Sequence, residues 1–120
     1  MKENLIRDKS YKFALRIIRA HKYIRENKKE YVLSKQLLRS GTSIGANIEE
    51  AIGGHSEKDF VSKLTIAYKE ARETKYWINL LRDSKYIEGV AAESLLEDCD
   101  ELCRIISKIQ TTMKEKLICN

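Results

Sequence analysis

The sequence predicts an all-α protein, and three observations lead to that prediction. Its 120 residues include no proline and only five glycines. Charged residues make up 34% of the chain, and apolar residues recur at alternating spacings of four and three. Proline and glycine interrupt helices, and a four-three repeat places apolar side chains on one helix face. We therefore expect one domain over residues 1–120, an up-down-up-down antiparallel four-helix bundle preceded by an N-terminal extension at residues 1–9.

The first helix is expected to begin near Ser10, because serine is a favourable N-cap residue. Phe13, Ile17, Ala20 and Ile24 would face the core, and the apolar pattern breaks at residues 27–30.

The second helix is expected over about residues 32–52, because Gly53-Gly54 is a strong helix-ending signal. Its apolar seam consists of Leu37, Gly41, Ile44, Ile48 and Ala51. A second line with the same spacing consists of Gln36, Ser40, Ser43, Asn47 and Glu50. A solvated face is rarely this small and uncharged, so we expect these side chains to hydrogen-bond to fixed partners on a neighbouring helix or another subunit.

The third helix is expected to open at Ser56, since residues 56–59 resemble a capping box, and to end at residues 83–85. The fourth is expected from about Glu88-Gly89 to near Lys116. Apolar seams run along both helices, at Phe60, Leu64, Ala67, Ala71, Thr74, Ile78 and Leu81, and at Leu95, Cys99, Leu102, Ile106, Ile109 and Met113. Connections of a few residues require neighbouring helices to run antiparallel.

The cysteines and the apolar content indicate in which part of the cell the protein is found. Cys99, Cys103 and Cys119 are an odd number, and the first two lie four residues apart on an apolar helix face. This arrangement suits reduced core thiols better than a disulfide framework. No window approaches the ~20 apolar residues of a membrane span. We expect a cytoplasmic protein with no membrane association.

Positive charge is concentrated at the N-terminus. Residues 1–30 hold ten lysines and arginines against four acids, a net charge of +6. The whole chain has a net charge of +5, so the remaining residues have a net charge of −1. The candidate nucleic-acid-binding residues lie on a stripe opposite the apolar face of the first helix: Lys9, Lys12, Arg16, Arg19 and Lys22. A merely solvated face is the alternative. The fourth helix opens with six acids, Glu88, Glu93, Glu97, Asp98, Asp100 and Glu101. The first two suit the positive end of the helix dipole. The other four form an acidic face, and attraction of the basic first helix of a neighbouring subunit is a further interpretation.

Acidic residues also raise an enzymatic alternative. All-α nucleotide pyrophosphohydrolases hold Mg²⁺ with acids three residues apart on two antiparallel helices, and Glu70, Glu73, Glu97 and Asp100 have that spacing. The expected lysines for a triphosphate are not arranged around them, and a solvated or salt-bridged face is the competing interpretation. We therefore expect no catalytic residues, no metal and no cofactor.

The chain resembles a known family over nearly its whole length, most strongly over residues 34–81. The residues that carry the resemblance are Ser34, Gln36, Arg39, Ser40, Ser43, Asn47, Glu50 and Ala51, then Ser56, Asp59 and Phe60, then Glu70, Glu73, Thr74, Tyr76 and Trp77. This pattern resembles the four-helix-bundle family of ribosomal-RNA intervening-sequence proteins, which is similar to the accessory variability proteins of diversity-generating retroelements. The resemblance implies a homopentameric ring, a basic surface suited to RNA or DNA, and no established enzymatic activity.

By position, the residues that match the family's polar motif are Gln36, Arg39, Ser40, Ser43, Asn47, Glu50 and Glu73. We interpret them as a structural or interface stripe, in which Arg39 pairs with Glu50 or Glu73, while Gly41 and Gly45 permit close helix approach. The sequence thus predicts a non-enzymatic, homo-oligomeric adaptor that binds itself and RNA or DNA, with a reverse transcriptase or another protein as a candidate partner. The alternatives are the Mg²⁺-dependent hydrolase and a purely protein-binding scaffold.

Overall fold

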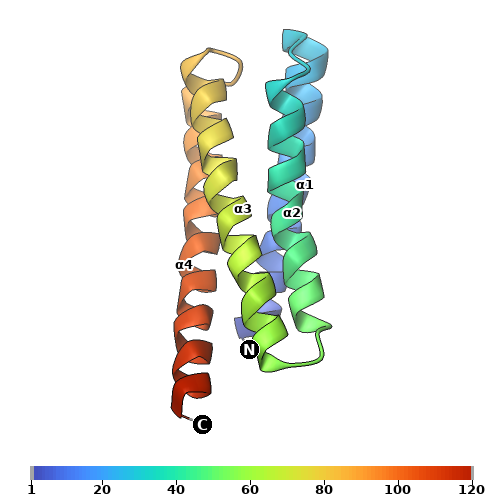
Figure 1. The fold of residues 1–120 in the computed structure, drawn as a ribbon. Coiled ribbons are helices and arrows are strands. Elements are labelled where there is room, and N and C mark those ends of the chain that lie inside the picture. The colour runs from blue at the N-terminus through green and yellow to red at the C-terminus, as the bar shows by residue number, and fades with distance from the viewer. Residues whose placement is uncertain (1, 120) are drawn as a thin grey trace.

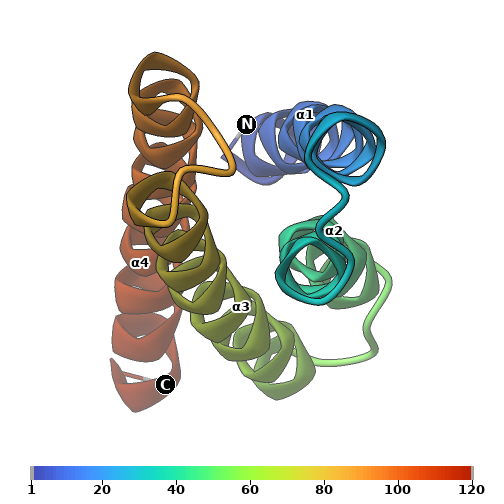
Figure 2. The same ribbon diagram turned by 90° about the horizontal axis from the view of Figure 1, so that it is seen from above.

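The computed structural model describes residues 2–119, which form four long helices (Figure 1). α1 spans Lys2–Lys28, α2 spans Leu33–Ile52, α3 spans Glu57–Asp83 and α4 spans Gly89–Cys119. Consecutive helices run antiparallel in a rod of 52 × 21 × 21 Å. α1 and α3 each pack against both α2 and α4, so every helix has two neighbours (Figure 2). The predicted all-α four-helix bundle is confirmed.

The core is built from the apolar seams that the four-three repeat predicted. All five seam residues of α2 are buried, from Leu37 to Ala51. In α3 the buried residues run from Leu64 to Leu81, and in α4 the seam is buried from Leu95 to Ile109. Most of these side chains are isoleucine, leucine or alanine, and burying a large one contributes about 1.5–3 kcal/mol. Within residues 2–119 no helix is both long and apolar enough to cross a membrane.

The start of the first helix differs from the prediction. Residues 2–9 are not an extension, because α1 already begins at Lys2. Ile6 is buried, which places it seven residues before Phe13 on the same face. Ser10 is not an N-cap: it is buried inside the helix, and its hydroxyl donates to the backbone carbonyl of Arg7 at 3.2 Å. The repeat of the apolar face continues through Ser10, and burial outweighs its preference for a cap.

Local capping fixes where α2 and α3 begin. The carboxylate of Glu30 accepts hydrogen bonds from the backbone N–H groups of Val32, Leu33 and Ser34 at 2.8–3.0 Å. The Ser56 hydroxyl accepts from the backbone N–H of Asp59 at 3.1 Å, as the capping-box pattern predicted. These acceptors satisfy N–H groups that have no partner inside the helix. At the other end of the chain, α4 continues to Cys119 rather than ending near Lys116.

A glycine allows α1 and α2 to approach closely. A Cβ atom on Gly41 would lie 2.7 Å from Cγ1 and 2.8 Å from Cγ2 of Ile17. Ile17 is fully buried and branched at Cβ, so it has little freedom to move away. Gly45, one turn later, would place a Cβ at an ordinary 3.5 Å from the backbone oxygen of Ser10. The predicted close approach therefore depends on Gly41 much more than on Gly45.

Candidate nucleic-acid interface and polar network

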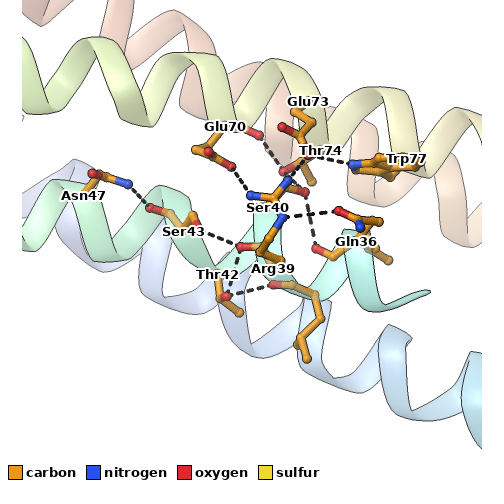
Figure 3. A network of polar contacts seen from close by, with 12 residues as sticks. Gln36, Arg39, Ser40, Thr42, Ser43, Asn47, Glu70, Glu73, Thr74 and Trp77 are labelled. Carbon is orange, nitrogen blue, oxygen red and sulfur yellow. Dashed lines mark hydrogen bonds and ion pairs between the residues drawn. The ribbon is translucent and has the colours of Figure 1, made fainter. Parts of the chain in front are cut away.

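The polar line of α2 lies against α3 of the same chain (Figure 3). Arg39 is ion-paired with Glu73 and, at 3.4 Å, with Glu70. The same Glu73 carboxylate accepts from Nε1 of Trp77 at 2.9 Å, and Gln36 accepts from Nε of Arg39 at 3.3 Å. Arg39 is about half exposed, with 48% of its side-chain surface accessible, so solvent screens the two ion pairs. Their main effect is to orient α2 and α3 relative to each other.

A buried hydrogen bond joins the same two helices. The hydroxyl groups of Ser40 and Thr74 lie 3.0 Å apart and both residues are buried. Thr74 also donates to the backbone carbonyl of Glu70 at 2.7 Å. Among the described residues, no buried side-chain nitrogen or oxygen lacks a hydrogen-bond partner. The bond between Ser40 and Thr74 thus links α2 to α3 inside the core, and a register shift between the two helices would break it.

The remaining residues of the predicted stripe have partners nearby. The Ser43 hydroxyl donates to the carbonyl of Arg39 at 2.7 Å, and Asn47 Nδ2 donates to the carbonyl of Ser43 at 2.8 Å. Glu50 is ion-paired with Lys63 of α3 at 3.0 Å, so Arg39 takes Glu73 rather than Glu50 as its partner. Ser40 and Glu50 thus have the predicted kind of partner on a neighbouring helix, whereas the hydrogen bonds of Gln36, Ser43 and Asn47 to described residues stay within α2.

Two residues of the basic stripe connect α1 to α4. Lys9 is ion-paired with Glu101 at 3.2 Å. Arg16 lies 2.6 Å from Asp98 and also donates to the Ser94 hydroxyl at 3.0 Å. The acidic face of α4 thus attracts the basic first helix of its own chain. Because these two cations have carboxylate partners, they offer little charge to a nucleic acid.

The other three residues of the stripe remain on the outer surface of α1. Lys12, Arg19 and Lys22 are exposed, and no ion pair among the described residues includes them. Exposed apolar side chains lie on the same helix: Tyr11, Leu15 and Ile18, with 67%, 40% and 45% of their surface accessible. The outer face of α1 is therefore both basic and partly apolar, which is typical of an interaction surface.

The four acids of the hydrolase alternative do not meet at one place. Glu70 and Glu73 contact Arg39 between α2 and α3. Asp100 is ion-paired with Lys75 between α3 and α4 at 2.5 Å, and Glu97 is exposed on α4. Within the described part of the chain, no group of three or more His, Cys, Asp or Glu side chains is placed to hold a metal ion. Three of the acids are thus salt-bridged and Glu97 lies on the exposed surface, which agrees with the competing interpretation of a solvated or salt-bridged face.

A cysteine pair on α4 has chemistry that the sequence reasoning missed. Cys99 is buried and its thiol donates to the carbonyl of Ala71 at 3.1 Å, whereas Cys103 is partly exposed. When Cys103 ionises, the Cys99 thiol turns its one proton from Ala71 to the thiolate, and this hydrogen bond, together with the positive charge of Lys75, lowers the pKa of Cys103 to about 7. The same hydrogen bond and burial raise the pKa of Cys99. The four-residue spacing was visible in the sequence, but the approach of Lys75 from α3 was not.

The chain was compared with known proteins. Residues 2–108 match the family model described as 23S rRNA-intervening sequence protein. A crystal structure from Bacteroides thetaiotaomicron, of a protein with unknown function from the S23 ribosomal protein family, superposes with a TM-score of 0.91. The two sequences are 48% identical over 92% of this chain and 99% of the other. No curated protein matches the sequence. The predicted resemblance to intervening-sequence proteins is thereby confirmed.

Proposed function

This chain belongs to the 23S rRNA-intervening sequence protein family, and we propose that it is a cytoplasmic, non-enzymatic homo-oligomer that associates with RNA or with nucleic-acid complexes. The observation that carries the proposal is the set of exposed cations on the outer face of α1. Lys12, Arg19 and Lys22 are free of ion pairs with any described residue, and the chain has a net charge of +5. Cations of this kind contact phosphates and release counterions from the nucleic acid.

Assembly would multiply this surface. The exposed side chains of Ile66 on α3 and Val90 on α4, which are on other helices than the three cations, are apolar area that a second subunit can cover. The family resemblance supports a closed ring, with five subunits as the expected number. A ring repeats the three cations in every subunit, so that contacts that are weak in one subunit add up through avidity. The polar stripe of α2 offers less support for assembly, since most of it is satisfied within the chain.

Binding is tested by a salt titration. Wild type is compared with a triple variant, Lys12→Glu, Arg19→Glu and Lys22→Glu, for a fluorescent single-stranded RNA. Arg16 is left in place because it bonds Asp98. A control triple, Lys58→Glu, Lys69→Glu and Lys114→Glu, changes the net charge equally at exposed positions on α3 and α4. We expect log K to fall by about 0.7 per neutralised phosphate per unit of log salt, and the α1 triple to reduce that slope by about 2 per subunit.

The outcomes separate the alternatives. Equal loss of affinity in both triples would mean that only net charge matters, and the α1 surface would lose its role. If wild type binds no RNA or DNA at low salt, the protein-binding scaffold becomes the better hypothesis. Light scattering at micromolar concentration tests the assembly, and a monomer would contradict it. Release of pyrophosphate from nucleoside triphosphates with Mg²⁺ would favour the hydrolase.

A further inference from the structure

A hollow lies at the C-terminal end of α1, where the chain turns into α2. Its volume is about 500 Å³, and its lining includes three cations, Lys22, Arg25 and Lys29, against one acid, Glu26. Among the described residues, none of these cations takes part in an ion pair. A concave surface with three such cations is a place where a phosphate group is electrostatically favoured.

An aromatic ring and an aliphatic side chain form another part of the lining. Tyr31 and Ile18 both line the hollow and are 52% and 45% exposed. The guanidinium carbon of Arg25 lies 5.7 Å from the centre of the Tyr31 ring, which is within range of a cation–π contact. That contact holds the ring in place while much of its surface stays accessible. The hollow therefore combines a stacking surface with cations.

The backbone of Lys29 explains why Tyr31 lies over α1. Lys29 has a φ of 54°, in the left-handed region that commonly terminates a helix. This residue ends α1 and reverses the chain, so Tyr31 returns to Arg25 instead of extending into solvent. This arrangement could not be predicted from the sequence, since a glycine is the usual residue at such a position.

We propose that this hollow binds one nucleotide of a single-stranded nucleic acid, with its base stacked on Tyr31 and its phosphates against Lys22, Arg25 and Lys29. The proposal rests on the proposed function and adds a site to it. A duplex hides the faces of its bases, whereas a single strand exposes them for stacking on aromatic rings. An acidic peptide would use the three cations but not the ring. RNA and DNA single strands share the required chemistry, and the experiment distinguishes them.

The two histidines provide a direct readout. His21 lines the hollow, while His55 lies in the α2–α3 connection at the opposite end of the bundle (Figure 1). Burial and the nearby Arg25 lower the pKa of His21, so its ring is less protonated at pH 7 than that of an ordinary histidine. In a titration with AMP followed by proton NMR, we expect the His21 resonances to move and those of His55 to stay. Oligo-glutamate is the comparison ligand.

Two variants test the ring and the charge separately. Tyr31→Ala should weaken binding of a labelled RNA of about ten nucleotides by roughly 5- to 150-fold, the usual effect of losing one stacked base. Tyr31→Phe keeps the ring and should bind like wild type. Lys29→Gly removes a charge at a position whose φ suits glycine, so it should weaken binding without a loss of folding. Tyr76→Ala, at an exposed tyrosine of α3, and Lys58→Gln are matched controls.

The nucleotide-binding proposal can be refuted while the proposed function still holds. If Tyr31→Ala and Lys29→Gly bind the single strand as wild type does, while the α1 triple variant does not, the hollow is not the site and the proposed function stands. If oligo-glutamate moves the His21 signals as far as AMP does, the hollow is a general anion site and the nucleotide proposal is wrong. Equal affinity for a duplex of the same length would overturn the stacking argument. DNA and RNA strands tested in parallel show which sugar is preferred.

Discussion

Replacing Gly41 with alanine tests whether the close approach of α1 and α2 depends on an absent side chain. The new Cβ would lie 2.7 and 2.8 Å from the two γ carbons of Ile17, far inside van der Waals contact. Overfilling a packed core costs about 1–3 kcal/mol, and the rigid, buried Ile17 favours the upper half of that range. Alanine gains about 1 kcal/mol over glycine in helix propensity. We therefore expect Gly41→Ala to lose about 1–2 kcal/mol of stability.

Gly45→Ala is the matched control. Its Cβ would meet its nearest neighbour, Ser10, at 3.5 Å, so only the gain in helix propensity remains. We expect it to stabilise the protein by about 0.5–1 kcal/mol. For a chain of this size, 1 kcal/mol corresponds to about 4 °C in Tm. The two substitutions should therefore shift Tm in opposite directions.

Thermal melts followed by circular dichroism, all at one protein concentration, measure both shifts. Ile17→Ala removes both γ carbons, so combining it with Gly41→Ala should be less harmful than the sum of the two changes by about 1–2 kcal/mol. A Gly41→Ala variant as stable as wild type would refute the reasoning. So would strict additivity in the double variant.

Three further predictions concern capping, the core and the thiols. Burial alone raises the pKa of Glu30, but the backbone N–H groups at the start of α2 outweigh it and lower the pKa. The carboxylate therefore stabilises the fold when the pH is above the pKa of Glu30 in the unfolded chain, and this stabilisation is lost as the pH falls. In denaturant titrations, Glu30→Gln should cost about 0.5–2 kcal/mol at pH 7 and much less near about pH 3. Thr74→Val should cost about 1–2 kcal/mol by removing the hydroxyl that bonds Ser40 across the two helices. An unchanged denaturation midpoint would show that the pair is dispensable. The rate at which iodoacetamide modifies Cys103 should reach half of its maximum near pH 7, and Cys99 should react much more slowly. Equal rates at both sites in peptide mass spectrometry would contradict the lowered pKa of Cys103.

Several features of the fold could be predicted because they depend on local chemistry. The seam from Leu37 to Ala51 identified the buried face of α2, since only a 3.6-residue period keeps apolar side chains on one side. Gly53-Gly54 and Ser56 located the turn into α3 for similar reasons, as helix ends need specific backbone conformations and hydrogen-bond acceptors. The start of α1 was missed because a serine such as Ser10 fits both an N-cap position and a buried position inside a helix.

The candidate site depended much more on how the helices pack. The sequence showed that α1 is basic and that α4 is acidic, but not that Arg16 and Lys9 meet Asp98 and Glu101 of the same chain. Which cations remain free depends on the rotation of each helix about its own axis, and that rotation is set by packing the cores together. Tyr31 reaches Arg25 for a related reason, because a single left-handed residue directs the chain back over α1.

The sequence by itself determined the helical class, the buried faces, the polar line on α2 and the family, because each of these depends on residues close together along the chain. Only the tertiary structure decided which charges are neutralised, which partner satisfies the polar line, and where cations and an aromatic ring meet. Ion pairs and hydrogen bonds act over a few ångströms, and those distances exist only after distant segments have been packed side by side.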